Sequence, residues 1–99
     1  MKILLVCNAG MSTSMLVSRM QKAAEKEKLE VEINAVPIMQ AENMLSEWDI
    51  VMLGPQVRHQ LSYLQKKADH QTPICVIDMR DYGMMNGEKV LAAALKAIG

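Results

Sequence analysis

Cys7 stands directly before a short stretch of small and hydroxyl residues, and this neighbourhood contains the parts of a nucleophilic site. Residues 8–14 read Asn-Ala-Gly-Met-Ser-Thr-Ser. A glycine-containing loop that leads into a helix directs backbone N–H groups at one point, and the helix adds about half a positive charge there. Such a point binds phosphate and favours the thiolate form of a nearby cysteine, which is the nucleophile. We therefore predict that Cys7 attacks phosphorus and that the phosphoryl group is held by Asn8, Ala9, Gly10, Met11, Ser12, Thr13 and Ser14.

An alternative interpretation gives Cys7 no chemical role. A cysteine can simply end a buried strand as a small apolar side chain, and the hydroxyls at 12–14 can serve only as an N-terminal helix cap. Cys75 provides a contrast within the chain. It lies inside the apolar run 73–77 with no loop to activate it, so we expect an inert core residue. The place of Cys7 at the end of an apolar run, before a glycine-containing loop, favours the nucleophile.

An arginine is missing from the stretch after Cys7. The loop of a cysteine phosphatase places an arginine six residues after the cysteine, where its guanidinium holds the phosphate and stabilises charge in the transition state. Thr13 occupies that position here. A phosphocysteine in this loop would lack a strong catalyst of its own hydrolysis and could persist until it is transferred. This predicts a phosphoryl carrier; the alternatives are a small cysteine phosphatase or arsenate-reductase-like enzyme, and a regulatory module without catalysis.

Apolar periodicity predicts the elements that must position this stretch. Residues 3–7, 49–53 and 74–78 are mostly apolar runs, typical of parallel strands covered on both faces, whereas residues 31–36 alternate as in an edge strand. We therefore predict one α/β domain, residues 1–99, in three layers, with helices on both faces of a four-stranded parallel sheet. Apolar residues at helical spacing follow each strand, at Leu16, Met20 and Ala23; at Ala41, Met44, Leu45 and Trp48; at Val57, Leu61, Leu64 and Ala68; and at Leu91, Ala94, Leu95 and Ile98.

Ligands of such sheets bind beyond the carboxyl ends of the strands, which directs attention to the segments after residues 7, 53 and 77. Gly54 can let the backbone approach the crevice closely, and Gln56 can offer an amide to a phosphate or to a partner. Tyr82 can point its hydroxyl toward Cys7 or simply pack over the rim. We predict Gly54, Gln56 and Tyr82 as rim residues of the site, against the alternative of ordinary turn chemistry.

Two carboxylates also follow the last predicted strand. In a phosphatase of this general layout, an aspartate from this loop protonates the leaving group. Thiolate attack on phosphorus does not require one where the leaving group already bears its proton. We therefore expect Asp78 to cap the end of the strand and Asp81 to be a solvated turn residue.

These segments resemble one known family. Residues 7–14, Leu-Gly-Pro-Gln at 53–56, Val-Ile-Asp at 76–78 and Tyr-Gly at 82–83 are similar to the enzyme IIB component of the lactose/cellobiose (lactose/N,N'-diacetylchitobiose) family of the bacterial phosphoenolpyruvate-dependent sugar phosphotransferase system. The resemblance covers essentially the whole chain. It implies the strand order 2-1-3-4, a layout similar to that of low-molecular-weight tyrosine phosphatases.

The resemblance also implies partners and a direction of transfer. Cys7 would accept a phosphoryl group from a phosphohistidine of the IIA component, with residues 8–14 as its cradle. It would then pass the group to a sugar bound by the membrane component IIC, such as the β-glucoside disaccharide cellobiose. Asn8 stands where the family often has serine, a small polar exchange that leaves a backbone cradle intact. His59 follows the Gly-Pro-Gln match less tightly and receives no role.

Composition limits the remaining classes of protein. The 99 residues include 11 Lys and Arg against 11 Asp and Glu, which argues against a nucleic acid as partner. No apolar run approaches the roughly 18 residues that cross a bilayer, so we expect a cytoplasmic protein that does not insert into the membrane. Two cysteines and two histidines form no metal-site pattern, and we expect neither a metal nor an organic cofactor. A carrier that presents one face to two partners in turn is expected to be a monomer.

The chain contains ten methionines and no phenylalanine. Methionine is a flexible core-filling residue, and most of the ten are expected to serve in this way. Met11, Met84 and Met85 differ because they fall in predicted loops near the Cys7 end of the sheet. We predict that these three form an adaptable apolar rim that docks IIA and IIC in turn.

Overall fold

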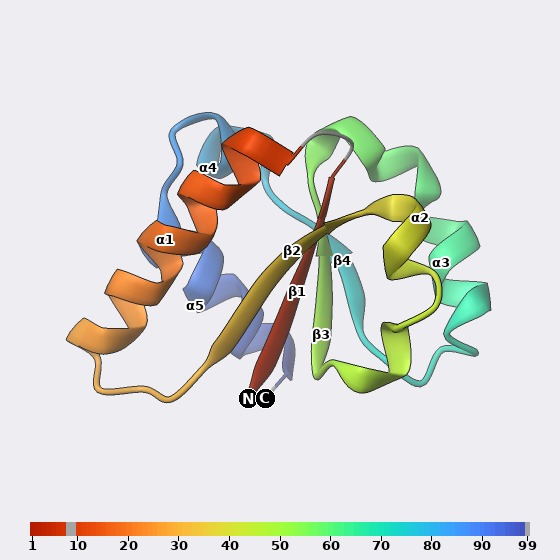
Figure 1. Cartoon of the computed structure of the whole chain (residues 1–99), viewed down its shortest axis with the longest axis horizontal. Coiled ribbons are helices and arrows are strands. Elements are labelled where there is room, and N and C mark those ends of the chain that lie inside the picture. The colour runs from red at the N-terminus through yellow and green to blue at the C-terminus, as the bar shows by residue number, and fades with distance from the viewer. Residues whose placement is uncertain (8–9, 99) are drawn as a thin grey trace.

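Within the part of the chain that the structure describes, four parallel strands form one sheet in the order β2-β1-β3-β4 (Figure 1). The computed structural model describes the backbone of residues 1–7 and 10–98 and the side chains of residues 1–7 and 13–98. The strands are β1 (Lys2–Cys7), β2 (Glu32–Pro37), β3 (Ile50–Leu53) and β4 (Ile74–Val76). The helices are α1 (Gly10–Lys26), α2 (Ile38–Ala41), α3 (Leu61–Lys67), α4 (Met79–Gly83), α5 (Gly87–Ile98) and the 3₁₀ helices η1 (Leu45–Glu47) and η2 (Pro55–Gln60).

The central strand β1 divides the core into two apolar clusters. Alternate side chains of a strand point to opposite faces, so Ile3 and Leu5 enter one cluster and Leu4 and Val6 the other. Helices α1 and α5 cover the first face, whereas α2, η1 and α3 cover the second (Figure 1). Each buried aliphatic side chain of β1 stabilises the fold by about 1.5–3 kcal/mol. The predicted α/β fold class and strand order are therefore confirmed.

The edges of the sheet agree with the sequence patterns. β2, which alternates buried and exposed residues, is an edge strand as predicted. β4 forms the other edge and ends at Val76, two residues before the predicted boundary, although the Ile77 N–H still donates to the Leu53 carbonyl at 2.8 Å. Asp78 then accepts from two backbone N–H groups and caps α4.

Three helix predictions need correction. The helix predicted around Ala41 and Trp48 is split into α2 and η1, and the Thr72 hydroxyl donates to the carbonyl of Leu45, the first residue of η1. The helix predicted around Val57 consists of the 3₁₀ helix η2 followed by α3, and η2 is kinked at buried Val57, which has φ −116° and ψ 17°. Residues 79–83, predicted as a loop, form the short helix α4.

Helices α1 and α5 cross at Gly87. A Cβ atom added to Gly87 would lie 2.5 Å from the Arg19 carbonyl carbon and 2.7 Å from the Met20 nitrogen. Both are backbone atoms, which cannot move without shifting the whole of α1. The close approach of the two helices therefore requires glycine at this position.

Gly87→Ala is expected to lower the free energy of unfolding by about 1–3 kcal/mol, because the methyl group overpacks a rigid contact. Chemical denaturation followed by circular dichroism measures the change. Gly83→Ala is the matched control, since a Cβ atom there meets no other atom within 4 Å of it among the described residues. Equal effects of the two substitutions would contradict the packing argument.

Candidate functional site

Cys7 is the last residue of the central strand and lies at the carboxyl edge of the sheet. It pairs with Pro37 of β2 and is only 2% exposed. The segments that follow β3 and β4 reach the same edge, because all four strands run in one direction (Figure 1). The segments after residues 7, 53 and 77, which the sequence predicted to bind the ligand, therefore lie at one edge of the sheet.

The predicted cradle consists largely of helix. α1 begins at Gly10, so residues 10–14 occupy its first turns, and the hydroxyls predicted to precede the helix as caps lie inside it. Asn8 and Ala9 lie outside the described residues, as do the side chains of Met11 and Ser12. A helix that starts three residues after the cysteine still presents its unpaired N–H groups toward that end of the sheet.

Thr13, the residue found in place of the phosphatase arginine, is buried beside Tyr82. It is 1% exposed because it begins the inward stripe of α1 that continues through Leu16 and Met20. Its Oγ1 lies 3.5 Å from the Tyr82 hydroxyl, 69 positions away in sequence. Ser14, the next residue, is exposed. The contact between Thr13 and Tyr82 joins the start of α1 to α4.

The three predicted rim residues lie close together, with Gly54 beside both Gln56 and Tyr82. The Gly54 N–H donates to the Val6 carbonyl at 2.8 Å, which extends the ladder between β1 and β3. A Cβ atom on Gly54 would lie 3.0 Å from the Gln56 Oε1 and 3.5 Å from the Tyr82 ring. Gly54 thus lets Gln56 and Tyr82 approach the last residues of β1. The proximity of the three residues is observed, whereas their roles toward phosphate or partner remain predictions.

The two carboxylates after β4 differ in environment. An Asp78 oxygen accepts from the N–H groups of Arg80 at 2.9 Å and Asp81 at 3.1 Å, so this carboxylate is engaged as the cap of α4. Asp78 therefore caps a helix rather than the end of the strand. Asp81 is half-buried within α4, not a solvated turn residue as predicted.

Cys75, predicted as an inert core residue, packs against the core cluster that α1 and α5 cover. It is half-buried on the edge strand β4, and burial raises the pKa of its thiol. The neutral thiol is a poor nucleophile, and the inertness of Cys75 stays a prediction.

A hollow of about 630 Å³ adjoins Tyr82 between η2 and α4. Its lining includes Gln56, Arg58, His59 and Met79, and the Met79 side chain is 62% exposed. Met79 and Arg58 are neighbours of the site that were not predicted from the sequence. Their segments are brought together by the packing of β3 beside β4, and no local pattern marks either residue.

Fold and site together define a class: a small α/β protein with a buried cysteine at the carboxyl edge of a parallel sheet, three residues before the start of a helix. The sequence model of one family, "PTS system, Lactose/Cellobiose specific IIB subunit", matches residues 2–93. The chain therefore belongs to the lactose/cellobiose-specific IIB family of the phosphotransferase system, as its sequence resemblance predicted. It is a sugar-phosphotransferase carrier component.

Known relatives agree with this assignment. The galactose-specific EIIB component of Lactococcus lactis subsp. cremoris and the cellobiose-specific EIIB component of L. lactis subsp. lactis are each 49% identical over 93% of this chain and 91% of theirs. The solution structure of a cellobiose-specific IIB component from Borrelia burgdorferi is 42% identical, with a TM-score of 0.82 over 99% of this chain and 91% of that one.

A more distant structure shares the fold alone. The lactose-specific IIB domain from Streptococcus pneumoniae has a TM-score of 0.88 at 19% identity and covers 100% of this chain and 98% of that one. IIB components work with IIA and membrane IIC components of the same system. Among residues 1–7 and 10–98, no helix has the length and apolar character needed to span a membrane.

Thr13→Val and Tyr82→Phe each remove one hydroxyl of the buried pair, and each is expected to lower the free energy of unfolding by about 0.5–1.5 kcal/mol. The double variant should lose less than the sum of the two, because it leaves no buried hydroxyl without its partner. Chemical denaturation of the four proteins measures the coupling. Tyr63→Phe, on an exposed tyrosine, is the control; strictly additive losses would mean that the two hydroxyls do not interact.

Proposed function

We propose that this IIB component carries the phosphoryl group on the sulfur atom of Cys7. The supporting observation is the place of Cys7 as the buried last residue of the central strand, three residues before the first residue of α1. α1 is 17 residues long, and the partial positive charge at its N-terminal end favours a bound dianion. The predicted cradle, residues 8–14, belongs to this proposal.

The proposed reaction consists of two displacements at phosphorus. The Cys7 thiolate attacks the phosphohistidine of IIA, so that an S–P bond forms and the N–P bond breaks. The imidazole leaves as a neutral group, because its other nitrogen already holds a proton. A sugar hydroxyl at IIC then attacks the same phosphorus, the S–P bond breaks, and the thiolate is restored while the hydroxyl proton passes to a base on IIC or to water.

Thr13 favours storage of the phosphoryl group over its release to water. A guanidinium at that position would hold the phosphate at two points and stabilise the transition state of hydrolysis. Thr13 instead directs its hydroxyl at Tyr82 inside the protein. The S–P bond is therefore expected to persist until the acceptor arrives.

The acceptor that we propose is a β-glucoside disaccharide such as cellobiose, bound by IIC at the cytoplasmic side of the membrane. A cellobiose-specific relative supports this choice, and a relative named for galactose has the same identity to the chain. Another, at 44% identity, is named for oligo-β-mannosides, from Bacillus subtilis. The protein is proposed to act as a monomer, so that one face meets both partners.

Incubation with phosphoenolpyruvate, the general phosphotransfer proteins and a matching IIA should add one phosphoryl group to the wild-type protein and to Cys75→Ser. Cys7→Ser should gain none, because no thiolate remains at the edge of the sheet. Intact mass spectrometry measures the gain. Membranes that contain IIC should then discharge the group when cellobiose is added, and less when galactose or a β-mannoside replaces it.

Other outcomes of this experiment decide between classes of protein. Rapid release of inorganic phosphate without membranes or sugar would indicate a cysteine phosphatase. Phosphorylation that survives Cys7→Ser would place the phosphoryl group elsewhere. No modification of any variant would indicate a module without catalysis.

The methionines predicted to dock partners fall into two kinds. Met84 is 65% exposed at the end of α4, whereas half-buried Met85 packs against the core cluster of α1 and α5. Met84 is therefore the better candidate for an adaptable docking contact. The Met11 side chain lies outside the described residues.

Met84→Ser is expected to slow phosphoryl transfer from IIA several-fold, through a higher KM for phosphorylated IIA, without lowering the unfolding temperature. Met85→Ser should instead destabilise the fold by about 1–3 kcal/mol, because a side chain that packs on the core is lost. Steady-state transfer kinetics and thermal unfolding separate the two effects. Unchanged kinetics of Met84→Ser would remove this residue from the docking surface.

A further inference from the structure

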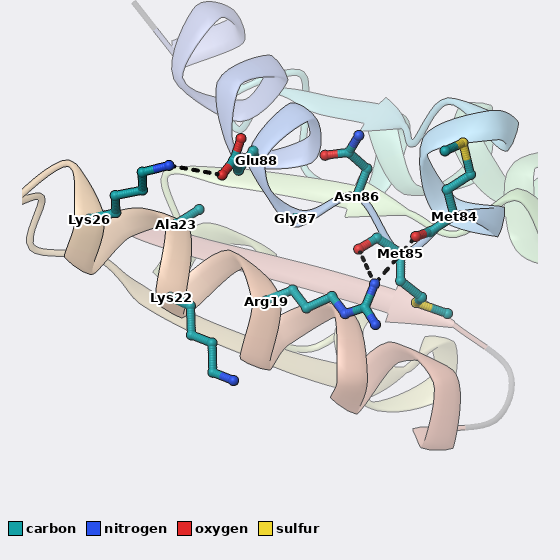
Figure 2. Close-up of a pocket in the computed structure, with 9 residues that line it drawn as sticks. All are labelled: Arg19, Lys22, Ala23, Lys26, Met84, Met85, Asn86, Gly87 and Glu88. Carbon is teal, nitrogen blue, oxygen red and sulfur yellow. Dashed lines mark hydrogen bonds and ion pairs between the residues drawn. The ribbon is translucent and has the colours of Figure 1, made fainter.

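Arg19 of α1 reaches across to the turn between α4 and α5. Its Nη1 donates to the Met85 carbonyl at 3.2 Å and to the Met84 carbonyl at 3.4 Å (Figure 2). These carbonyls end α4, where the last backbone acceptors of a helix lack intrahelical partners. A cation at this end is favourable for the same reason. Arg19 therefore fixes the turn from the neighbouring helix.

The turn itself has an unusual residue at its centre. Met85 has φ 51°, the left-handed conformation that glycine normally supplies where a helix ends. The Met85 N–H donates to the Tyr82 carbonyl, and the Asn86 N–H donates to the Asp81 carbonyl. A left-handed methionine is strained and persists only where its surroundings hold it. The contacts of Arg19 are among those surroundings.

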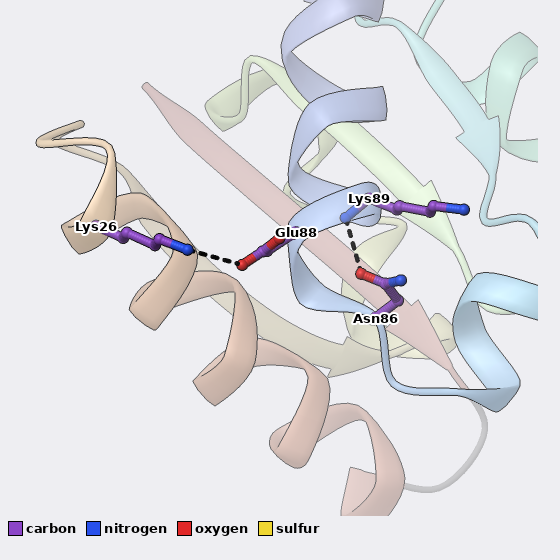
Figure 3. Close-up of polar contacts among 4 residues, drawn as sticks. All are labelled: Lys26, Asn86, Glu88 and Lys89. Carbon is purple, nitrogen blue, oxygen red and sulfur yellow. Dashed lines mark hydrogen bonds and ion pairs between the residues drawn. The ribbon is translucent and has the colours of Figure 1, made fainter.

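The turn places Tyr82 relative to the rest of the molecule. Tyr82 lies three residues before Met85, and its carbonyl accepts from the Met85 N–H. On the other side of the turn, Asn86 caps α5 by accepting from the Lys89 N–H at 3.1 Å (Figure 3). Because α4 and α5 both join this turn, a shift of the turn would change the contact between Tyr82 and Thr13.

We propose that Arg19 is a positioning residue that holds Tyr82 against Thr13 at the Cys7 site. This inference rests on the proposed function of Cys7. Arg19 follows Thr13 by six residues, which is about 9 Å along α1. The same helix thus contacts the α4 segment at two levels, at Tyr82 beside the site and at the turn behind it. Two separated contacts fix the orientation of α4 where one would leave it free to pivot.

The chain offers a matched control between the same two regions. Lys26 Nζ lies 3.7 Å from Glu88 Oε1 and links α1 to α5 farther from Cys7 (Figure 3). Both side chains are largely exposed, and exposed ion pairs contribute little to stability. Lys26→Ala removes a cation from the same face of α1 without touching the turn (Figure 2).

Arg19→Ala is expected to lower kcat for transfer from phosphorylated IIA on the order of tenfold, because small displacements at a reacting centre reduce rates strongly. KM for IIA should change less than kcat, since the groups that Arg19 contacts are backbone carbonyls of the turn. Arg19→Lys, which keeps a donor, should restore part of kcat. Lys26→Ala should change neither constant by more than roughly twofold.

A double-mutant cycle with Tyr82→Phe tests whether Arg19 acts through Tyr82. In the Tyr82→Phe background, Arg19→Ala should cause no further loss of kcat, because the hydroxyl that it positions is already absent. An equal loss in both backgrounds would overturn the proposal. So would an Arg19→Ala effect confined to KM, which would make Arg19 a contact for the partner.

A second measurement keeps this inference separate from the proposed function. Alkylation of Cys7 by iodoacetamide, in a Cys75→Ser background, reports the site without any partner. Arg19→Ala should change this rate in the Tyr82 protein and not in Tyr82→Phe, while Lys26→Ala leaves it unchanged. If wild-type protein accepts no phosphoryl group, the proposed function fails and the alkylation cycle alone decides: an identical change in both backgrounds overturns the role of Arg19.

Discussion

β1 lies between β2 and β3, and helices cover both of its faces, so the strand that ends in Cys7 is held from four sides. Its register with both neighbours sets Cys7 opposite Pro37 and lets the Gly54 N–H reach the Val6 carbonyl. An edge strand lacks one of these ladders, and on β4 the cysteine is only half-buried. A thiol at the end of the central strand thus has a fixed position from which the residues of two further segments can be arranged.

The second constraint is the packing of α1 against the segment that contains α4 and α5. Gly87 allows α5 to approach the backbone of α1, the turn before it is held by Arg19, and Tyr82 meets Thr13. All of these contacts are made by α1, from Arg19 and Met20 in its middle to Thr13 in its first turns. α1, whose first turn faces the site, therefore also supports α4 and the turn between α4 and α5.

Much of this architecture could be predicted from local patterns. The apolar run that ends in Cys7, the alternation in β2 and the helical spacing in α1 and α5 each agree with the structure, because burial of these residues follows their periodicity. The patterns failed at short elements. Val57 leaves helical geometry to enter the core, and α4 has only five residues, with an aspartate cap as its main signal. In elements of this length, tertiary contacts outweigh the periodic signal.

Residue types alone established a thiol before a glycine-containing stretch, the absence of an arginine from that stretch and the similarity to a phosphotransferase IIB component, since these depend on the order of residues in one segment. Tertiary structure decided which distant groups meet. Thr13 and Tyr82 are 69 positions apart, and Arg19 is 66 positions from the Met85 carbonyl that it contacts. Such contacts depend on the angle at which helices cross and on a left-handed turn at Met85. Neither has a local signature, because both are set by packing across the whole fold.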